Sequence, residues 1–115
     1  MKKYTFKDYF VAPEGKIAKR MLFKSDDVIA FVLNIAKDEI LPGHTHMEST
    51  LFIQVMEGHA KVVTDGNETL LEVGELMQVD GQESLQVINV GKEVLRLYVT
   101  ISPMGSEAFA TDANV

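Results

Sequence analysis

The chain contains no cysteine and no run of about eighteen apolar residues. Without cysteine there is no disulfide framework, no thiolate nucleophile and no thiolate metal site, so a metal would have to be held by histidine, carboxylate or amide oxygen. Without a long apolar run there is no helix to span a bilayer. Lysine and arginine number 11 against 17 acidic residues, for a formal charge of −6. Because affinity for polyanions is built from basic side chains, neither nucleic acid nor a membrane surface is an expected partner.

Sequence signatures of several enzyme classes are also missing. No serine lies in a Gly-x-Ser-x-Gly context and there is no glycine-rich phosphate loop, so hydrolase and nucleotide-binding functions have no support. The basic start of the chain is followed by further charge and not by an apolar signal core, which predicts a cytoplasmic location. A chain of 115 residues has room for one hydrophobic core, so we expect a single domain.

Short segments rich in β-branched and apolar residues follow one another along the chain, with glycine, asparagine or aspartate between them. This pattern is typical of an all-β sandwich or barrel. Asp65-Gly66 between two such segments predicts a tight hairpin. The expected strands cover residues 17–23, 28–36, 51–57, 60–64, 68–73, 76–79, 85–90 and 94–101.

Two of these segments indicate how the strands are buried. Apolar and polar residues alternate over 95–101, which predicts one buried and one wet face. Residues 28–33 are continuously apolar, so both faces of that strand should be covered, by the opposite sheet and a terminal segment or by a second subunit. We favour the second subunit and therefore expect a homodimer. Residues 5–10 are expected to form a short helix or an arm, and residues 108–115 to be loose.

The segment from Pro42 to Gly58 is the chemically distinctive part of the chain. His44 and His46 are two residues apart, so on an extended strand both rings project from the same face. That arrangement suits a bidentate metal anchor. Paired histidines also form polar rims or hydrogen-bonded cavity walls, and spacing alone leaves both interpretations open.

The order His44-Thr45-His46 and then Gly58 resembles the first motif of the cupin superfamily, and the segment from Gly74 to Asn89 resembles the second. The resemblance implies a small cupin-type β-barrel, the double-stranded β-helix or jelly roll. It also implies a site in which three histidines and a carboxylate hold Fe, Mn, Ni, Zn or Cu. Here the third and fourth ligand positions of that pattern are occupied by Leu51 and Leu85.

The two leucines change what the site is expected to do. Two neutral imidazoles hold a divalent ion much less firmly than three or four ligands that include a charge, so a metal should be weakly held or absent. Glu48 is a candidate replacement carboxylate, although its place in an expected turn favours a solvated side chain. Gln54 should face away from the barrel centre because its parity is opposite to that of Leu51. His59 is expected at the surface.

Three functions follow from this pattern. In the first, the barrel binds a small organic molecule, with His44 and His46 as polar anchors and Leu51 and Leu85 as apolar wall. In the second, the chain is a metal-dependent enzyme, a dioxygenase or isomerase that uses the histidine pair. In the third, it is a structural dimer with a vestigial pocket. The expected organisation is an N-terminal arm and first strand over residues 1–27, a barrel over 28–101 and a C-terminal tail over 102–115.

Overall fold

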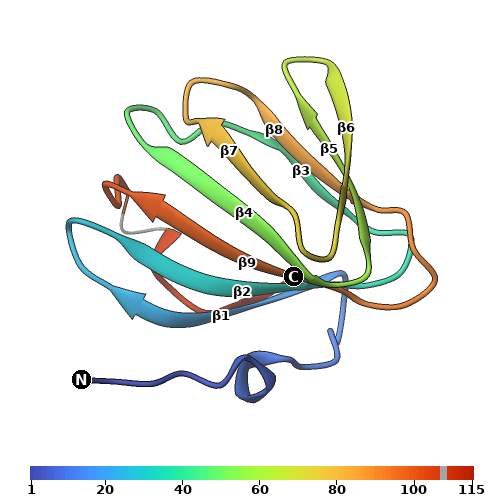
Figure 1. Cartoon of the computed structure of the whole chain (residues 1–115), viewed down its shortest axis with the longest axis horizontal. Coiled ribbons are helices and arrows are strands. Elements are labelled where there is room, and N and C mark those ends of the chain that lie inside the picture. The colour runs from blue at the N-terminus through green and yellow to red at the C-terminus, as the bar shows by residue number, and fades with distance from the viewer. Residues whose placement is uncertain (107–108) are drawn as a thin grey trace.

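Two antiparallel sheets form the walls of a barrel in the computed structural model, which describes residues 1–106 and 109–115 (Figure 1). The larger sheet has the order β10 (Ala113–Asn114), β1 (Ile17–Lys24), β2 (Ile29–Ile35), β9 (Leu95–Ser102), β4 (Thr50–Glu57) and β7 (Leu76–Asp80). The smaller sheet has the order β3 (Ile40–His44), β8 (Leu85–Asn89), β5 (His59–Thr64) and β6 (Asn67–Glu72). A single 3₁₀ turn, η1 (Phe6–Tyr9), precedes them.

The all-β barrel expected from the sequence is confirmed. Each expected strand is present with its ends within one residue of the predicted bounds, and η1 falls inside the short helix or arm expected over 5–10. Two strands, β3 and β10, were not predicted as separate segments. No helix in the two described ranges is long and apolar enough to cross a membrane.

The β5–β6 hairpin has the predicted tight turn. Thr64 pairs with Asn67, and the two residues between them have positive φ angles, 48° at Asp65 and 84° at Gly66. Positive φ at both central positions is the signature of the type I′ turn that suits the twist of paired strands. Local turn chemistry therefore sets the register of this hairpin.

The barrel core lies between the inner faces of the two sheets. The expected alternation of β9 is observed, with Leu95, Leu97, Val99 and Ile101 exposed by 0 to 4%. These side chains lie across from inward-facing residues of β2 and β4. The outward-facing residues Arg96, Tyr98 and Thr100 are half-buried and not fully wet, and part of the chain covers the first two.

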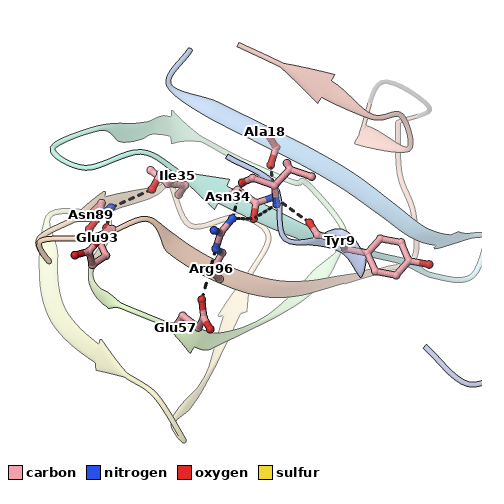
Figure 2. A network of polar contacts seen from close by, with 9 residues as sticks. Tyr9, Ala18, Asn34, Ile35, Glu57, Asn89, Glu93 and Arg96 are labelled. Carbon is pink, nitrogen blue, oxygen red and sulfur yellow. Dashed lines mark hydrogen bonds and ion pairs between the residues drawn. The ribbon is translucent and has the colours of Figure 1, made fainter. Parts of the chain in front are cut away.

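The N-terminal segment provides that cover and accounts for the two buried faces of β2 (Figure 2). The side chain of Asn34 is fully buried and donates hydrogen bonds to the carbonyls of Tyr9 and Ala18, at 3.2 and 3.0 Å. Its Oδ1 accepts the Val11 backbone N–H and a guanidinium N–H of Arg96. The terminal segment, one of the two covers considered for β2, therefore lies on this strand, and the homodimer stays a prediction.

The expectation of a loose C-terminal end is wrong for the part that the structure describes. Ala113 and Asn114 pair with β1, and the carbonyl of Val115 accepts the backbone N–H groups of Lys16 and Ile17. Residue 108 of the expected loose segment lies outside the described residues. These hydrogen bonds hold residues 113–115 against β1, although the small and polar side chains of the segment had suggested mobility.

Candidate functional site

A cavity of about 250 Å³ lies between the two sheets. The described side chains that line it are aliphatic or aromatic except for three, Lys19, His44 and His46. Those three are contributed by β1, by the end of β3 and by the turn after β3. The barrel interior is therefore an apolar pocket with a few polar groups, which is the usual composition of a site for small organic molecules.

The turn that carries His46 is held by Gly81, in the loop after β7. The His46 N–H donates to the Gly81 carbonyl at 2.8 Å, and the Gly81 N–H donates to the Ser49 carbonyl at 2.8 Å. A Cβ at position 81 would lie 1.9 Å from the His46 carbonyl oxygen. Only glycine allows this approach, so Gly81 places His46 at the cavity.

The two imidazoles lie together, as the His-x-His spacing predicted. Their ring centroids are 4.6 Å apart in an edge-to-face arrangement, and both rings line the cavity. Nδ1 of His44 lies 2.7 Å from the carbonyl oxygen of Pro42. Because a carbonyl can only accept, Nδ1 of His44 carries a proton and donates it in this contact.

His46 is the more deeply buried of the pair, with 6% of the residue exposed. Its Nδ1 has no hydrogen-bond partner among the described residues. Burial lowers the pKa of His46 to about 4, and the neighbouring His44 and Lys19 act in the same direction. The ring is therefore uncharged at neutral pH.

Sequence reasoning missed two residues of the site, Lys19 and Phe109. Lys19 lies on the inner face of β1 and faces the cavity, and its Nζ lies 4.3 Å from the centroid of the Phe31 ring. Phe109 reaches the cavity from the C-terminal tail and packs on the His46 ring, with 4.2 Å between centroids. The sequence held two signals for these residues. One was a lysine on the strand face that carries Ile17 and Met21, and the other was an aromatic residue in a tail of small, polar residues.

Leu51 and Leu85 also line the cavity, with 2% and 3% of each residue exposed. Leu85 pairs with His44 across β3 and β8, and Leu51 lies on β4 in the opposite sheet. The structure thus brings all four predicted site residues to one cavity. Their roles in binding a metal or a ligand stay predictions.

The other candidates lie outside this cavity. Glu48 is exposed and has a φ of 71°, in the turn between His46 and Ser49. Gln54 is half-buried and does not line the cavity. His59 is exposed, as expected, and its Nδ1 contacts the carboxylate of Glu72. Within residues 1–106 and 109–115, no three histidine or acidic side chains gather closely enough to hold a metal.

The donor set does not fit the four-ligand metal shell that the resemblance implies. Two imidazoles are present, while the leucines at the other two positions have no lone pair to offer. The ammonium of Lys19 is close enough to lower the pKa of His46. A positive charge in the same cavity also opposes the approach of a dication.

Comparison with known proteins agrees with this architecture. The model of the Cupin domain family (Cupin_2) matches residues 31–101. The chain belongs to the cupin domain family. This match spans most of β2 to most of β9 and includes the histidine pair and the cavity wall except for Lys19 and Phe109. A search of curated proteins found no significant match.

Solved cupin structures share the fold at low sequence identity. The protein TT1209 from Thermus thermophilus superposes with a TM-score of 0.83 at 21% identity, covering 90% of this chain and 98% of the other. A double-stranded β-helix protein from Klebsiella pneumoniae gives 0.83 at 18% identity, with 98% and 90% covered. An RmlC-like cupin from Desulfovibrio desulfuricans gives 0.80 at 22%, with 90% and 97% covered. Identity this low shows the fold and leaves the activity to be argued from the site.

Outside the histidine pair, the residues that match the cupin motifs stabilise the barrel backbone. Gly58 and Gly74 have φ angles of 97° and 91°, a region that side chains disfavour. The buried side chain of Asn89 donates to the carbonyls of Ile35 and Glu93, at 3.0 and 2.9 Å. The residues that match the family pattern therefore stabilise the barrel. The two residues that differ from it at ligand positions, Leu51 and Leu85, lie on the cavity wall.

Proposed function

We propose that this cupin binds a compact, largely apolar organic molecule in its barrel cavity without using a metal. The observation that carries the proposal is the presence of Leu51 and Leu85 on the cavity wall, at the two positions where the family pattern places metal ligands. Each leucine replaces a coordinating atom by hydrocarbon. Burying the hydrocarbon of a ligand against this wall contributes roughly 25 cal/mol per Å² of apolar surface removed from water.

The size of the cavity limits the ligand. A volume of about 250 Å³ holds on the order of eight water molecules at roughly 30 Å³ each. A molecule of on the order of ten non-hydrogen atoms fits that space. The three polar side chains of the wall would orient it, and the aliphatic side chains would supply most of the affinity.

Filling the cavity tests this proposal. The probe is 1-hexanol, with binding measured by ligand-observed NMR and calorimetry. We expect Leu85→Phe and Ile53→Phe, which both place a ring in the cavity, to weaken 1-hexanol binding at least tenfold. Leu70→Phe adds a ring at a site 63% exposed on β6 and should leave binding unchanged. Melting curves establish that each variant is folded.

Two results would contradict cavity binding. One is the absence of binding to the wild-type protein, at millimolar concentration, of both 1-hexanol and the carboxylate of the same chain length, hexanoate. The other is binding that persists unchanged in both filled variants, because the probe would then occupy another surface. The two substitutions lie on different sheets, so a folding failure of one leaves the other as the test.

A metal-dependent enzyme, a dioxygenase or isomerase, is the second candidate. The paired rings of His44 and His46 and the unpartnered Nδ1 of His46 favour it. Elemental analysis of protein purified without chelator discriminates between the two functions. A stoichiometric metal that is lost from a His44→Ala, His46→Ala variant would replace the metal-free proposal.

A structural homodimer is the third candidate. Phe52 on β4 and Leu76 on β7 are exposed by 39% and 61%, and they lie on the outer face of the larger sheet. A second copy could cover this apolar surface. Light scattering at micromolar concentration tests the dimer, and a monomer would remove this candidate.

A further inference from the structure

Lys19 is the one charged side chain among the described residues that line the cavity. It lies on the inner face of β1, where its register partner is Leu33 of β2, and it is half-buried. Lysine is seldom placed on the apolar face of a strand, because removing its ammonium from water is costly unless a partner compensates. The partners of this ammonium therefore indicate what the cavity is built to hold.

The close contacts of Lys19 with the described residues are with one carbonyl and one aromatic ring. Nζ donates one hydrogen bond to the carbonyl of Phe109 and faces the ring of Phe31 at 4.3 Å. An ammonium has three donors, so two have no acceptor among the described residues after the bond to Phe109. No carboxylate in residues 1–106 or 109–115 forms an ion pair with Lys19.

Asp112 is the acidic residue whose charge acts on Lys19. Its carboxylate favours the charged form of the ammonium, although burial has the larger effect and lowers the pKa of Lys19. Oδ1 of Asp112 accepts the backbone N–H of Met21 at 2.6 Å. This carboxylate therefore bonds to the backbone of β1, and it is not among the described residues that line the cavity.

The rest of the polar end of the cavity has no acid among the described residues either. His46 is uncharged at neutral pH, and its buried Nδ1 has no partner among the described residues. His44 lies beside it. The described lining therefore carries one positive charge, two imidazoles and no negative charge.

We propose that the ligand is a small monocarboxylic acid, bound as its anion, whose carboxylate pairs with Lys19 and whose hydrocarbon part fills the apolar cavity. This inference rests on the proposed function and names its ligand class. A carboxylate accepts the free ammonium donors in charge-assisted hydrogen bonds. One buried cation compensates one negative charge, so a dianion such as a phosphate monoester would leave a charge unpaired.

The test compares two probes that share a chain and differ in charge. Hexanoate and 1-hexanol each carry a six-carbon chain, one ending in a carboxylate and the other in a neutral hydroxyl. Binding of both is measured by calorimetry and ligand-observed NMR at pH 7. We expect the wild-type protein to bind hexanoate at least tenfold more tightly than 1-hexanol.

Two substitutions at Lys19 assign that preference to its charge. Lys19→Met keeps an unbranched apolar chain and removes the ammonium, so it should abolish the preference for hexanoate while retaining 1-hexanol binding. Lys19→Arg keeps the positive charge and should retain a preference for hexanoate. Melting curves report the fold, and Lys61→Met, which removes a β5 lysine paired with Glu68 and outside the cavity, is the matched control.

The outcomes separate this inference from the proposed function. Equal binding of the two probes by the wild-type protein, or a preference that survives in Lys19→Met, overturns the carboxylate inference and leaves the apolar cavity intact. Failure of both probes to bind overturns both. A hexanoate preference that disappears only when the charge of Lys19 is removed supports the inference.

Discussion

The ring of Phe109 covers the ring of His46, with centroids 4.2 Å apart and planes inclined at 58°. Phe109→Ala removes this cover, so we expect the pKa of His46 to rise from about 4 towards 6.5 as water reaches the imidazole. NMR titration of the His46 ring measures the change. Phe52→Ala removes an exposed aromatic side chain of β4 and should leave the pKa unchanged. Equal pKa values in wild type and Phe109→Ala would mean that Phe109 does not shield the ring.

The depressed pKa of His46 makes stability depend on pH. In the unfolded chain the ring takes up a proton as the pH falls through 6.5, whereas in the folded protein it stays neutral until about pH 4. The unfolded state therefore binds more protons in this window. We expect the contribution of His46 to stability to be complete above pH 6.5 and to fall by up to about 3 kcal/mol by pH 4.

Urea denaturation between pH 7 and pH 4 measures this loss. Acidic residues also titrate in that range, so the informative quantity is the difference between the wild-type protein and His46→Gln. The variant should lose less stability on acidification. Parallel pH profiles for the two proteins would show that His46 does not contribute.

Gly81 is predicted to be intolerant of any side chain. In Gly81→Ala the new Cβ would lie 1.9 Å from the carbonyl oxygen of His46, so the backbone must move. We expect a loss of at least about 2 kcal/mol and a displaced His46 ring. Gly43→Ala is the control, because its Cβ would meet only the Ser84 hydroxyl, at 3.3 Å. Similar denaturation midpoints for the two variants would contradict this role of Gly81.

Asn89 is predicted to stabilise the barrel without acting in the site. Asn89→Ala removes bonds to the carbonyls of Ile35, Ala36 and Glu93 and leaves the N–H of Gly91 without its acceptor. The expected cost is about 2 to 4 kcal/mol by urea denaturation. Gln78→Ala, at an exposed position of β7, should change stability by less than about 0.5 kcal/mol. A neutral Asn89→Ala substitution would show that these bonds are dispensable.

The two leucines at the ligand positions can be replaced by side chains that bind metal. Leu51→Glu with Leu85→His supplies a carboxylate and a third imidazole to the cavity wall that already carries His44 and His46. We expect the double variant to be less stable than wild type without metal and to gain melting temperature on addition of Ni²⁺ or Zn²⁺. Adding His44→Ala and His46→Ala should abolish the gain. An equal rise in the melting temperature of the wild-type protein would contradict the inference that two imidazoles are too few ligands to hold the metal.

The strands could be predicted because their determinants are local. The turn at Asp65 and Gly66 needs positive φ at two successive positions, which the residue types themselves indicate. The alternation over β9 depends on which of its own residues are apolar and not on distant parts of the chain. The histidine pair and the two leucines could also be placed, because a family motif relates their spacing to one cavity.

The missed parts of the site depend on contacts that span the chain. The carbonyl of Phe109 reaches Lys19 across 90 positions of sequence. Neither residue belongs to a motif. The pairing of the tail with β1 is not indicated by any local sequence pattern. The choice between the two covers considered for β2 could not be made from the sequence for the same reason, since the hydrogen bonds of Asn34 to Tyr9 and Val11 are formed only in the folded chain.

One segment near each end of the chain contacts the strand that carries Lys19. β10 is hydrogen-bonded along the edge of β1, while η1 packs against the same strand (Figure 1). Tags or truncations at either end thus act directly on β1. Affinities obtained with fusion proteins should be compared with those of the tag-free polypeptide before any difference is attributed to the barrel interior.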